Sequence, residues 1–271
     1  MINNTQEAMS TEKAIEIFFC ANFQHEGLGS LYERVVLSRF LRGLARRYGY
    51  ASVVEYSCPV TKGCDNITFL EEGLHVTVAD ENIGRIRDSW KLPQQPVFSD
   101  LNTAPPADLV WNFAQIQMNE ALFDRMKRLS RKHLLIFVPN ILNIGTPAHL
   151  SYHLLTRTAC RHAERGSVRI RTKTGLLRFL KDRNVEVIES GYIDAPPLPD
   201  IGFSIRELKE TLGWSKPDHQ NGSSAPEAGP IADPQMVWQR VQQMIRFEKS
   251  RVVAPFKPVF GHHIFALGRI V

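Results

Sequence analysis

Short apolar runs alternate with stretches of helical periodicity along most of the chain. Five of the runs lie between residues 51 and 140, and most of them end in a polar or acidic residue. Because these runs are apolar at consecutive positions, they are typical of strands buried on both faces of a parallel sheet. The expected strands are Ser52–Tyr56, His75–Asp80, Pro96–Asp100, Leu109–Phe113, His133–Val138, Val185–Tyr192 and His263–Ile270.

Helical stretches separate the expected strands. Apolar residues between Leu31 and Ala45 recur at three- and four-residue intervals, with Ser30 as the expected N-cap and Gly49 as the stop. Alternation of strands and helices predicts an α/β fold with one mostly parallel, seven-stranded sheet and helices on both of its faces. The other expected helices are residues 11–20, 146–165, 172–183, 204–212 and 235–249.

The same pattern divides the chain into four parts. Residues 1–50 are expected to form an N-terminal helical lid, residues 51–200 the core of the sheet, and residues 251–271 its last strand. Residues 201–250 form a helical insertion, in which residues 216–234 are rich in Pro, Gly and Ser and are expected to be a mobile loop. Because an apolar helix face needs a partner surface, we expect the insertion to form a lid or a homodimer contact.

Composition limits the class of protein. Of 271 residues 43% are hydrophobic, which allows a sizeable core, and no apolar run reaches the roughly 18 residues of a membrane span. The polar N-terminus has no signal-peptide core, so the expected location is cytoplasmic. The net charge of +5 lies largely in Arg-rich helical stretches, which favours solvated helix faces over a surface for nucleic acid or anionic lipid. The four cysteines form no CxxC pair and are expected to be thiols.

Two strand ends carry candidate chemistry. Glu55 leads from the first strand into the turn 57–59, and Asp80 ends the second strand. A strand, a sharp turn into a helix and a second strand that ends in a carboxylate are how an open α/β sheet holds an adenosine cofactor. The separation of the two acids is close to the roughly 20 residues of dinucleotide folds. The alternative is that both are ordinary acids at strand ends.

Several segments resemble the class I S-adenosylmethionine-dependent methyltransferases. Residues 53–59 resemble the family's first motif, and residues 108–113 resemble its fourth strand, which opens onto the reacting methyl group. The resemblance covers roughly residues 30–200 and 255–271, and implies a Rossmann-like fold with S-adenosylmethionine as cofactor. It implies that Asp80 binds the ribose hydroxyls and that Asp100 approaches the adenine. The expected cofactor-binding residues are Glu55, Ser57, Lys62, Gly63, Asp80, Glu81, Asp100, Leu101 and Asn112.

The turn departs from the family pattern. Ser57 and Pro59 stand where glycines are expected, and Gly63 comes late. Proline has a fixed φ and no N–H to donate. Either the methionine end of the cofactor is held differently, with Lys62 supplying a charge, or cofactor binding has been lost. A nicotinamide cofactor is the rival, but the missing GxGxxG turn and the position of Asp100 argue against it.

The helix expected after the fifth strand carries His149, His153 and Cys160 on one face. Three interpretations compete: a half-buried face with polar contacts, a substrate-contacting or general-base histidine, and a zinc or iron site. The chain has no second ligand cluster with fixed spacing, so we expect no metal site. We expect His149 or His153 to be the catalytic base.

Two further groups have a structural alternative. His262 and His263, at the start of the last strand, are expected to be structural rather than ligands. Trp111 and Phe113 on the fourth strand either belong to the core or shape an apolar acceptor pocket.

The resemblance implies methyl transfer to a small or medium-sized acceptor. Two alternatives remain: a non-catalytic partner of another enzyme that binds S-adenosylmethionine or S-adenosylhomocysteine, which the altered turn favours, and a nucleic-acid methyltransferase, which the basic helices support weakly.

Overall fold

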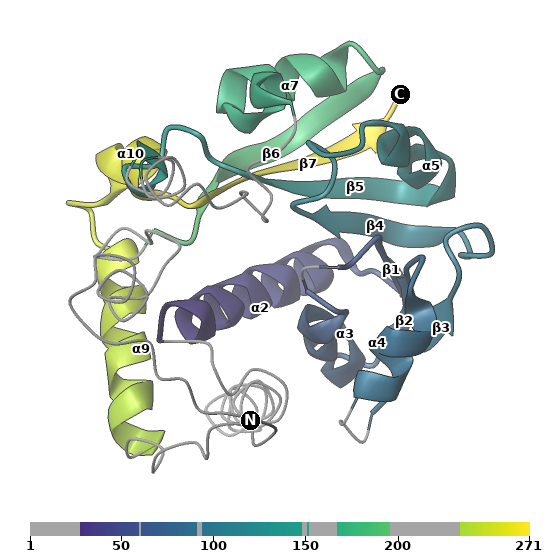
Figure 1. Cartoon of the computed structure of the whole chain (residues 1–271), viewed down its shortest axis with the longest axis horizontal. Coiled ribbons are helices and arrows are strands. Elements are labelled where there is room, and N and C mark those ends of the chain that lie inside the picture. Colours follow the sequence, from purple (N-terminus) through teal and green to yellow (C-terminus); the bar gives the residue numbers. More distant parts are fainter. Residues whose placement is uncertain (1–27, 60, 91–93, 148–150, 152–166, 196–233) are drawn as a thin grey trace, which may run out of the picture.

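The computed structural model describes residues 28–59, 61–90, 94–147, 151, 167–195 and 234–271. A seven-stranded sheet lies at the centre, in the order β3-β2-β1-β4-β5-β7-β6, and all neighbours are parallel except the two pairs that include β7 (Figure 1). The strands are β1 (Ser52–Tyr56), β2 (His75–Ala79), β3 (Val97–Ser99), β4 (Ala107–Phe113), β5 (Ser130–Pro139), β6 (Val185–Ile193) and β7 (His263–Ile270).

The sequence prediction of seven strands and a mostly parallel sheet is confirmed, with strand ends that differ by up to three residues. All seven residues of β4 are buried, as expected for a central strand covered on both faces. The parallel register aligns Glu55 of β1 with Trp111 of β4, and Phe113 of β4 with Phe137 of β5. The carboxyl ends of these strands therefore meet at one edge of the sheet.

Two helices pack on one face of the sheet, α5 (Ala121–Leu129) and α7 (Lys173–Lys181). Their apolar residues, including Phe123 and Phe179, form one core with inward residues of β4 and β5. The 3-10 turn η2 (Val168–Arg171) precedes α7, whose N-cap Thr172 accepts a hydrogen bond from the backbone of Gly175 at 3.1 Å. This cap satisfies one of the free N–H groups at the start of the helix.

The opposite face is covered by α2 (Leu28–Tyr48) and α3 (Ile67–Glu71). The expectation that Ser30 caps α2 is wrong, because the helix begins at Leu28 and Ser30 lies within its first turn. Gly49 ends the helix as expected, with a left-handed φ of 57°. The helix α4 (Ile83–Ser89) follows β2. None of the described helices is long and apolar enough to cross a membrane.

The helix α9 (Pro234–Glu248) packs on α2 of the same chain. Val241 and Ile245 are buried in one cluster with Leu31 and Val35 of α2, and the Tyr32 hydroxyl donates to Glu248 at 2.6 Å. This apolar face, for which the sequence suggested a lid or a homodimer contact, is therefore covered within the chain. The short η3 (Ala254–Phe256) and α10 (Lys257–Phe260) lead from α9 into β7. The expected helix 204–212 and residues 216–233 lie outside the described residues.

We expect Ile245→Ala to lower the free energy of unfolding by about 2–4 kcal/mol, because it removes a buried side chain between α9 and α2. The exposed Gln243→Ala on the same helix is the control and should stay within about 0.5 kcal/mol. Chemical denaturation measures both. Equal effects for the two variants would mean that α9 does not dock on α2 in solution.

Candidate functional site

The chain turns sharply where β1 ends, at the edge that carries the carboxyl ends of the parallel strands. Ser57 (φ 61°) and Lys62 (φ 51°) take the left-handed conformation although neither is glycine, and Gly63 follows at φ 78°. A Cβ on Gly63 would lie 3.0 Å from the Val78 side chain of β2, so the glycine also permits close approach to the sheet. Left-handed backbone costs about 1–2 kcal/mol for each non-glycine residue. The surrounding contacts must offset that cost.

Glu55 lies beneath this turn and is fully buried. Its carboxyl accepts hydrogen bonds from the Thr61 hydroxyl and from the Asn66 side-chain amide. The side-chain carbonyl oxygen of Asn66 in turn accepts from Trp111 Nε1 of β4 at 3.1 Å. Burial raises the pKa of Glu55 to about 8, although the two hydrogen bonds act in the opposite direction. A carboxyl in this position orients the turn and has no exposed atom to offer a ligand.

Asp80 follows β2 and is 4% exposed. One carboxylate oxygen accepts from the Cys58 backbone N–H at 2.8 Å and the other from the Asn82 backbone N–H at 2.8 Å. The side chain therefore joins the end of β2 to the turn after β1. A carboxylate has about four acceptor positions, so two remain for further hydrogen bonds.

Most backbone donors in the described part of the turn bond within the protein. The N–H groups of Ser57, Cys58, Lys62 and Cys64 donate to protein oxygens at 2.7–3.0 Å, and Pro59 has no N–H. A Gly-rich turn usually offers such groups to a bound anion. A ligand carboxylate at this turn must therefore be bound mainly by side chains.

Asn112 is fully buried near the end of β4. Its side-chain amide donates to the carbonyls of Tyr56 at 2.6 Å and Ser57 at 3.0 Å, and its carbonyl accepts from the Gln115 N–H at 3.1 Å. The residue holds β4 against the turn after β1. Asn112 therefore positions the turn, and it would affect a bound ligand only through that turn.

The remaining candidates lie along the same edge. Lys62, Glu81 and Asp100 are exposed, and Asp100 accepts from the Asn102 N–H at 2.8 Å. The Leu101 side chain is buried, and its carbonyl accepts from the Tyr56 hydroxyl at 3.1 Å. The exposed acids are thus at the ends of β2 and β3, and Lys62 is in the turn after β1.

Arg34 of α2 is a residue that sequence reasoning missed. It is 8% exposed, its guanidinium donates to Asp65 at 2.5 Å, and it lies 5.7 Å from the centre of the Phe113 ring. It therefore connects α2 with the turn after β1 and with the end of β4. An arginine among the apolar positions of an amphipathic helix is the signal that could have revealed it.

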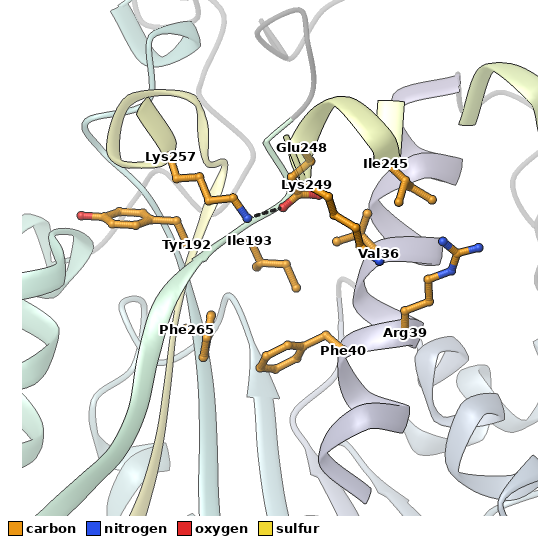
Figure 2. Close-up of a pocket in the computed structure, with 10 residues that line it drawn as sticks. All are labelled: Val36, Arg39, Phe40, Tyr192, Ile193, Ile245, Glu248, Lys249, Lys257 and Phe265. Carbon is orange, nitrogen blue, oxygen red and sulfur yellow. Dashed lines mark hydrogen bonds and ion pairs between the residues drawn. The ribbon is translucent and has the colours of Figure 1, made fainter. Parts of the chain in front are cut away.

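A cavity of about 350 Å³ lies beside α2, at the ends of β6 and β7 (Figure 2). Its rim includes the Glu248–Lys257 ion pair, with 3.4 Å between the charged atoms. Apolar and cationic side chains both line it, so it suits a molecule with an apolar body and an anionic group. The lining residues are Val36, Arg39, Phe40, Tyr192, Ile193, Ile245, Glu248, Lys249, Lys257 and Phe265.

The expected catalytic residues His149 and His153 lie outside the described residues, as does Cys160. Trp111 is fully buried and belongs to the core. Phe113 is also buried, but its ring lies 4.6 Å from the ring of His263 at the start of β7.

The strand order and the antiparallel β7 decide the fold. The chain has the Rossmann-like methyltransferase fold. Many solved S-adenosylmethionine-dependent methyltransferases match it over most of its length. No protein-family model and no curated protein sequence matches the chain.

Three of the matched structures illustrate the similarity. The plantazolicin methyltransferase BpumL in complex with SAH is 12% identical, has a TM-score of 0.47, and covers 98% of this chain and 99% of its own. A SAM-dependent methyltransferase from Archaeoglobus fulgidus is 14% identical, with a TM-score of 0.44 and coverage of 86% and 94%. A cyclopropane-fatty-acyl-phospholipid synthase-like protein from Lactobacillus casei is 12% identical, with a TM-score of 0.46 and coverage of 95% and 98%. The fold assignment itself depends on the chain's own strand order.

Glu55→Gln should change how stability depends on pH. The pKa of Glu55 in the folded chain, about 8, lies above its ordinary value of 4.5. The folded state therefore binds one proton more than the unfolded state between these values, and Glu55 lowers the free energy of unfolding as pH rises from about 5 to about 8. The neutral Gln removes this part of the slope, which chemical denaturation at several pH values measures.

The control for this experiment is Glu186→Gln on the exposed side of β6. It should leave the pH slope as it is in the unmodified chain. The same slope in the Glu55→Gln variant and in the unmodified chain would contradict a neutral buried carboxyl at Glu55.

Proposed function

We propose that the chain transfers a methyl group from S-adenosylmethionine to a small or medium-sized acceptor. One observation carries the proposal: the turn after β1, the Asp80 carboxylate after β2 and the end of β4 meet at one edge of the sheet. Ligands of open α/β sheets bind outside the carboxyl ends of the strands, where the strand order reverses. In this sheet that point lies between β1 and β4.

The adenosine half of the cofactor would lie over β2 and β3. Asp80 keeps two acceptor positions for ribose hydroxyls, and the exposed Glu81 beside it offers a second carboxylate. Asp100 and Leu101 after β3 would meet the adenine, as the sequence resemblance implied. Glu55 and Asn112 support this surface from below.

The methionine half would depend on side-chain charge. Because the turn offers few backbone donors, Arg34 and Lys62 are the proposed partners of the methionine carboxylate, with Ser57 and Gly63 shaping the turn beside it. Arg34 already binds Asp65, but a guanidinium has five N–H donors in a fixed plane and can bind a second carboxylate. This arrangement would replace the family's Gly-rich contact.

Methyl transfer is an in-line displacement. The acceptor atom bonds to the methyl carbon as the carbon–sulfur bond of the sulfonium breaks, and S-adenosylhomocysteine leaves. Catalysis of this step depends mainly on positioning and on exclusion of water. The cavity beside α2 is the proposed acceptor pocket. For a hydroxyl or amine acceptor, a base must take the released proton, and His149 or His153 remains the proposed group.

The second candidate function is that of a non-catalytic partner that binds the cofactor or its product. The altered turn, with its internally bonded N–H groups, is the observation that favours it. This alternative predicts cofactor binding without a methylated product. A nucleic-acid methyltransferase is the third possibility and predicts salt-dependent binding to RNA or DNA.

Calorimetry with S-adenosylhomocysteine tests the cofactor site. Asp80→Asn and Arg34→Lys should each weaken binding about 10- to 100-fold, the loss expected when a charge-assisted hydrogen bond worth about 1.5–3 kcal/mol is removed. Arg42→Lys is the matched control, since Arg42 lies two turns further along α2 and pairs with Glu71 at 2.7 Å. It should bind as the unmodified chain does.

Two results would count against the cofactor site. Absence of binding to both S-adenosylmethionine and S-adenosylhomocysteine rejects the proposed function. Equal losses in Arg34→Lys and Arg42→Lys remove Arg34 from the site while leaving the function open.

A methyl-transfer assay distinguishes an enzyme from a non-catalytic binding protein. The chain is incubated with methyl-labelled S-adenosylmethionine and the small-molecule fraction of a cell extract, and labelled product is measured. Val36→Phe, which fills the cavity, should lower the yield of labelled product roughly tenfold or more because it displaces the acceptor. Its affinity for S-adenosylhomocysteine should stay unchanged. The exposed Val168→Phe is the size-matched control. Tight cofactor binding with no labelled product from the unmodified chain would favour the non-catalytic partner.

A further inference from the structure

Four side chains that bind metals in other proteins meet where β6 ends and β7 begins. Asp194 directly follows β6, His262 directly precedes β7, His263 is its first residue, and Glu33 comes from α2. In Figure 1 this end of the two strands lies on the side of α9 and α10. One potential ligand atom from each residue lies within 4.8 Å of the other three.

The distances suit a shared ion. One Asp194 oxygen shares a hydrogen bond of 3.2 Å with His262 Nδ1, which an ion would replace, and lies 3.6 Å from His263 Nδ1. Around a tetrahedral ion with ligand bonds of about 2.1 Å, neighbouring ligand atoms lie roughly 3.4 Å apart. The two measured separations fall on either side of this value. Some ligand atoms of the group are up to 4.8 Å apart, so at least one side chain must move inward slightly for all four to reach one ion.

A second observation points to a ligand. His263 is 5% exposed, and its Nδ1 atom has no hydrogen-bond partner, although it faces the Asp194 carboxylate. A buried polar atom without a partner costs free energy. Asp194 is itself 4% exposed, so this nitrogen and this carboxylate face each other away from water. A cation between them would satisfy the nitrogen and balance the carboxylate.

The backbone around the group is held in place. Asp194 takes a left-handed φ of 62°, which is rare outside glycine. Its carbonyl accepts from the His262 N–H at 2.8 Å, and the His262 carbonyl accepts from the Asn140 N–H at 2.8 Å. These bonds fix the two histidines relative to the carboxylate before any ion binds.

We propose that Glu33, Asp194, His262 and His263 form a site for one divalent first-row transition-metal ion. Two imidazoles and two carboxylates are suitable ligands for zinc, iron or manganese, and the group has no thiolate that would select a softer ion. Magnesium and calcium prefer ligand sets made of oxygen alone, so they should bind weakly. This site differs from the stretch of His149, His153 and Cys160, and it would give His262 and His263 a role beyond the structural one expected from the sequence.

The site would adjoin the acceptor pocket. Asp194 follows Ile193, which lines the cavity, and Glu33 lies one helical turn before Val36, which also lines it. An ion here would bind an acceptor through an oxygen atom and hold it beside the end of β4. This role depends on the proposed function, whereas metal binding itself does not.

Calorimetry and elemental analysis test the site in the full chain after treatment with a chelator. The probes are Zn²⁺, Mn²⁺ and Fe²⁺ alone, with Mg²⁺ for comparison. We expect one transition-metal ion per chain, a rise in melting temperature on binding, and at least a hundredfold preference over Mg²⁺. Co²⁺ in the same site should give visible absorption bands typical of nitrogen and oxygen ligands. Binding no tighter than that of Mg²⁺ would overturn the proposal.

Two variants and one control localise the ion. His262→Gln, at a partly exposed side chain, and Asp194→Asn should each weaken metal binding more than roughly 100-fold. Loss of a residue that only hydrogen-bonds to a metal ligand costs roughly 10- to 100-fold, so a larger loss indicates a direct ligand. His133→Gln, at a histidine that bonds Tyr50 near the other end of β5, should bind the ion normally. If Asp194→Asn does not fold, His262→Gln alone decides. Equal affinity in His262→Gln and His133→Gln would overturn the site whether or not the chain binds S-adenosylmethionine.

Discussion

The buried carboxyl of Glu55 is the interaction on which the candidate site depends. It binds Thr61 and Asn66 from the turn that follows β1, and Asn66 binds Trp111 of β4. A single buried group therefore sets the position of the turn relative to two central strands. Two hydrogen bonds offset part of the free energy that it costs to remove this carboxyl from water. Burial also raises its pKa to about 8, so the carboxyl is mostly protonated and uncharged at neutral pH. The turn is therefore held at the edge of the sheet by the protein's own hydrogen bonds.

The altered turn changes which part of the chain can bind an anion. With glycines, backbone N–H groups would face the ligand, but here these groups bond to protein oxygens, and the left-handed positions are occupied by Ser57 and Lys62. Positive charge near the turn comes instead from Lys62 and from Arg34 on α2. The helix α2, which belongs to the expected N-terminal lid, thus contributes Arg34 to the candidate site. The helix α9 packs on α2 through the cluster that includes Val241.

The fold followed from the sequence because apolar runs and helical periodicity record burial directly. Both ends of β1 and β7 were predicted correctly, and Gly49 ends α2 as expected. Side-chain partners were harder to predict, because they depend on distant elements. Asp80 was expected to face a ligand, yet both of its oxygens also bind backbone N–H groups. Arg34 carries no motif, and the group around Asp194 joins residues from α2, β6 and β7, whose approach no local spacing reveals.

Consecutive residues of α2 connect the two halves of the proposed site. Arg34 donates to Asp65 in the turn after β1, and its guanidinium also lies 4.0 Å from the carboxylate of Glu33, which belongs to the group at the start of β7. The Phe113 ring lies near both groups, 5.7 Å from the Arg34 guanidinium and 4.6 Å from the His263 ring. In-line transfer requires the acceptor atom to approach the methyl carbon from the side opposite to the carbon–sulfur bond that breaks. At the end of β4, Asn112 bonds the turn after β1 and the Phe113 ring contacts His263, so this is where the two substrates would meet.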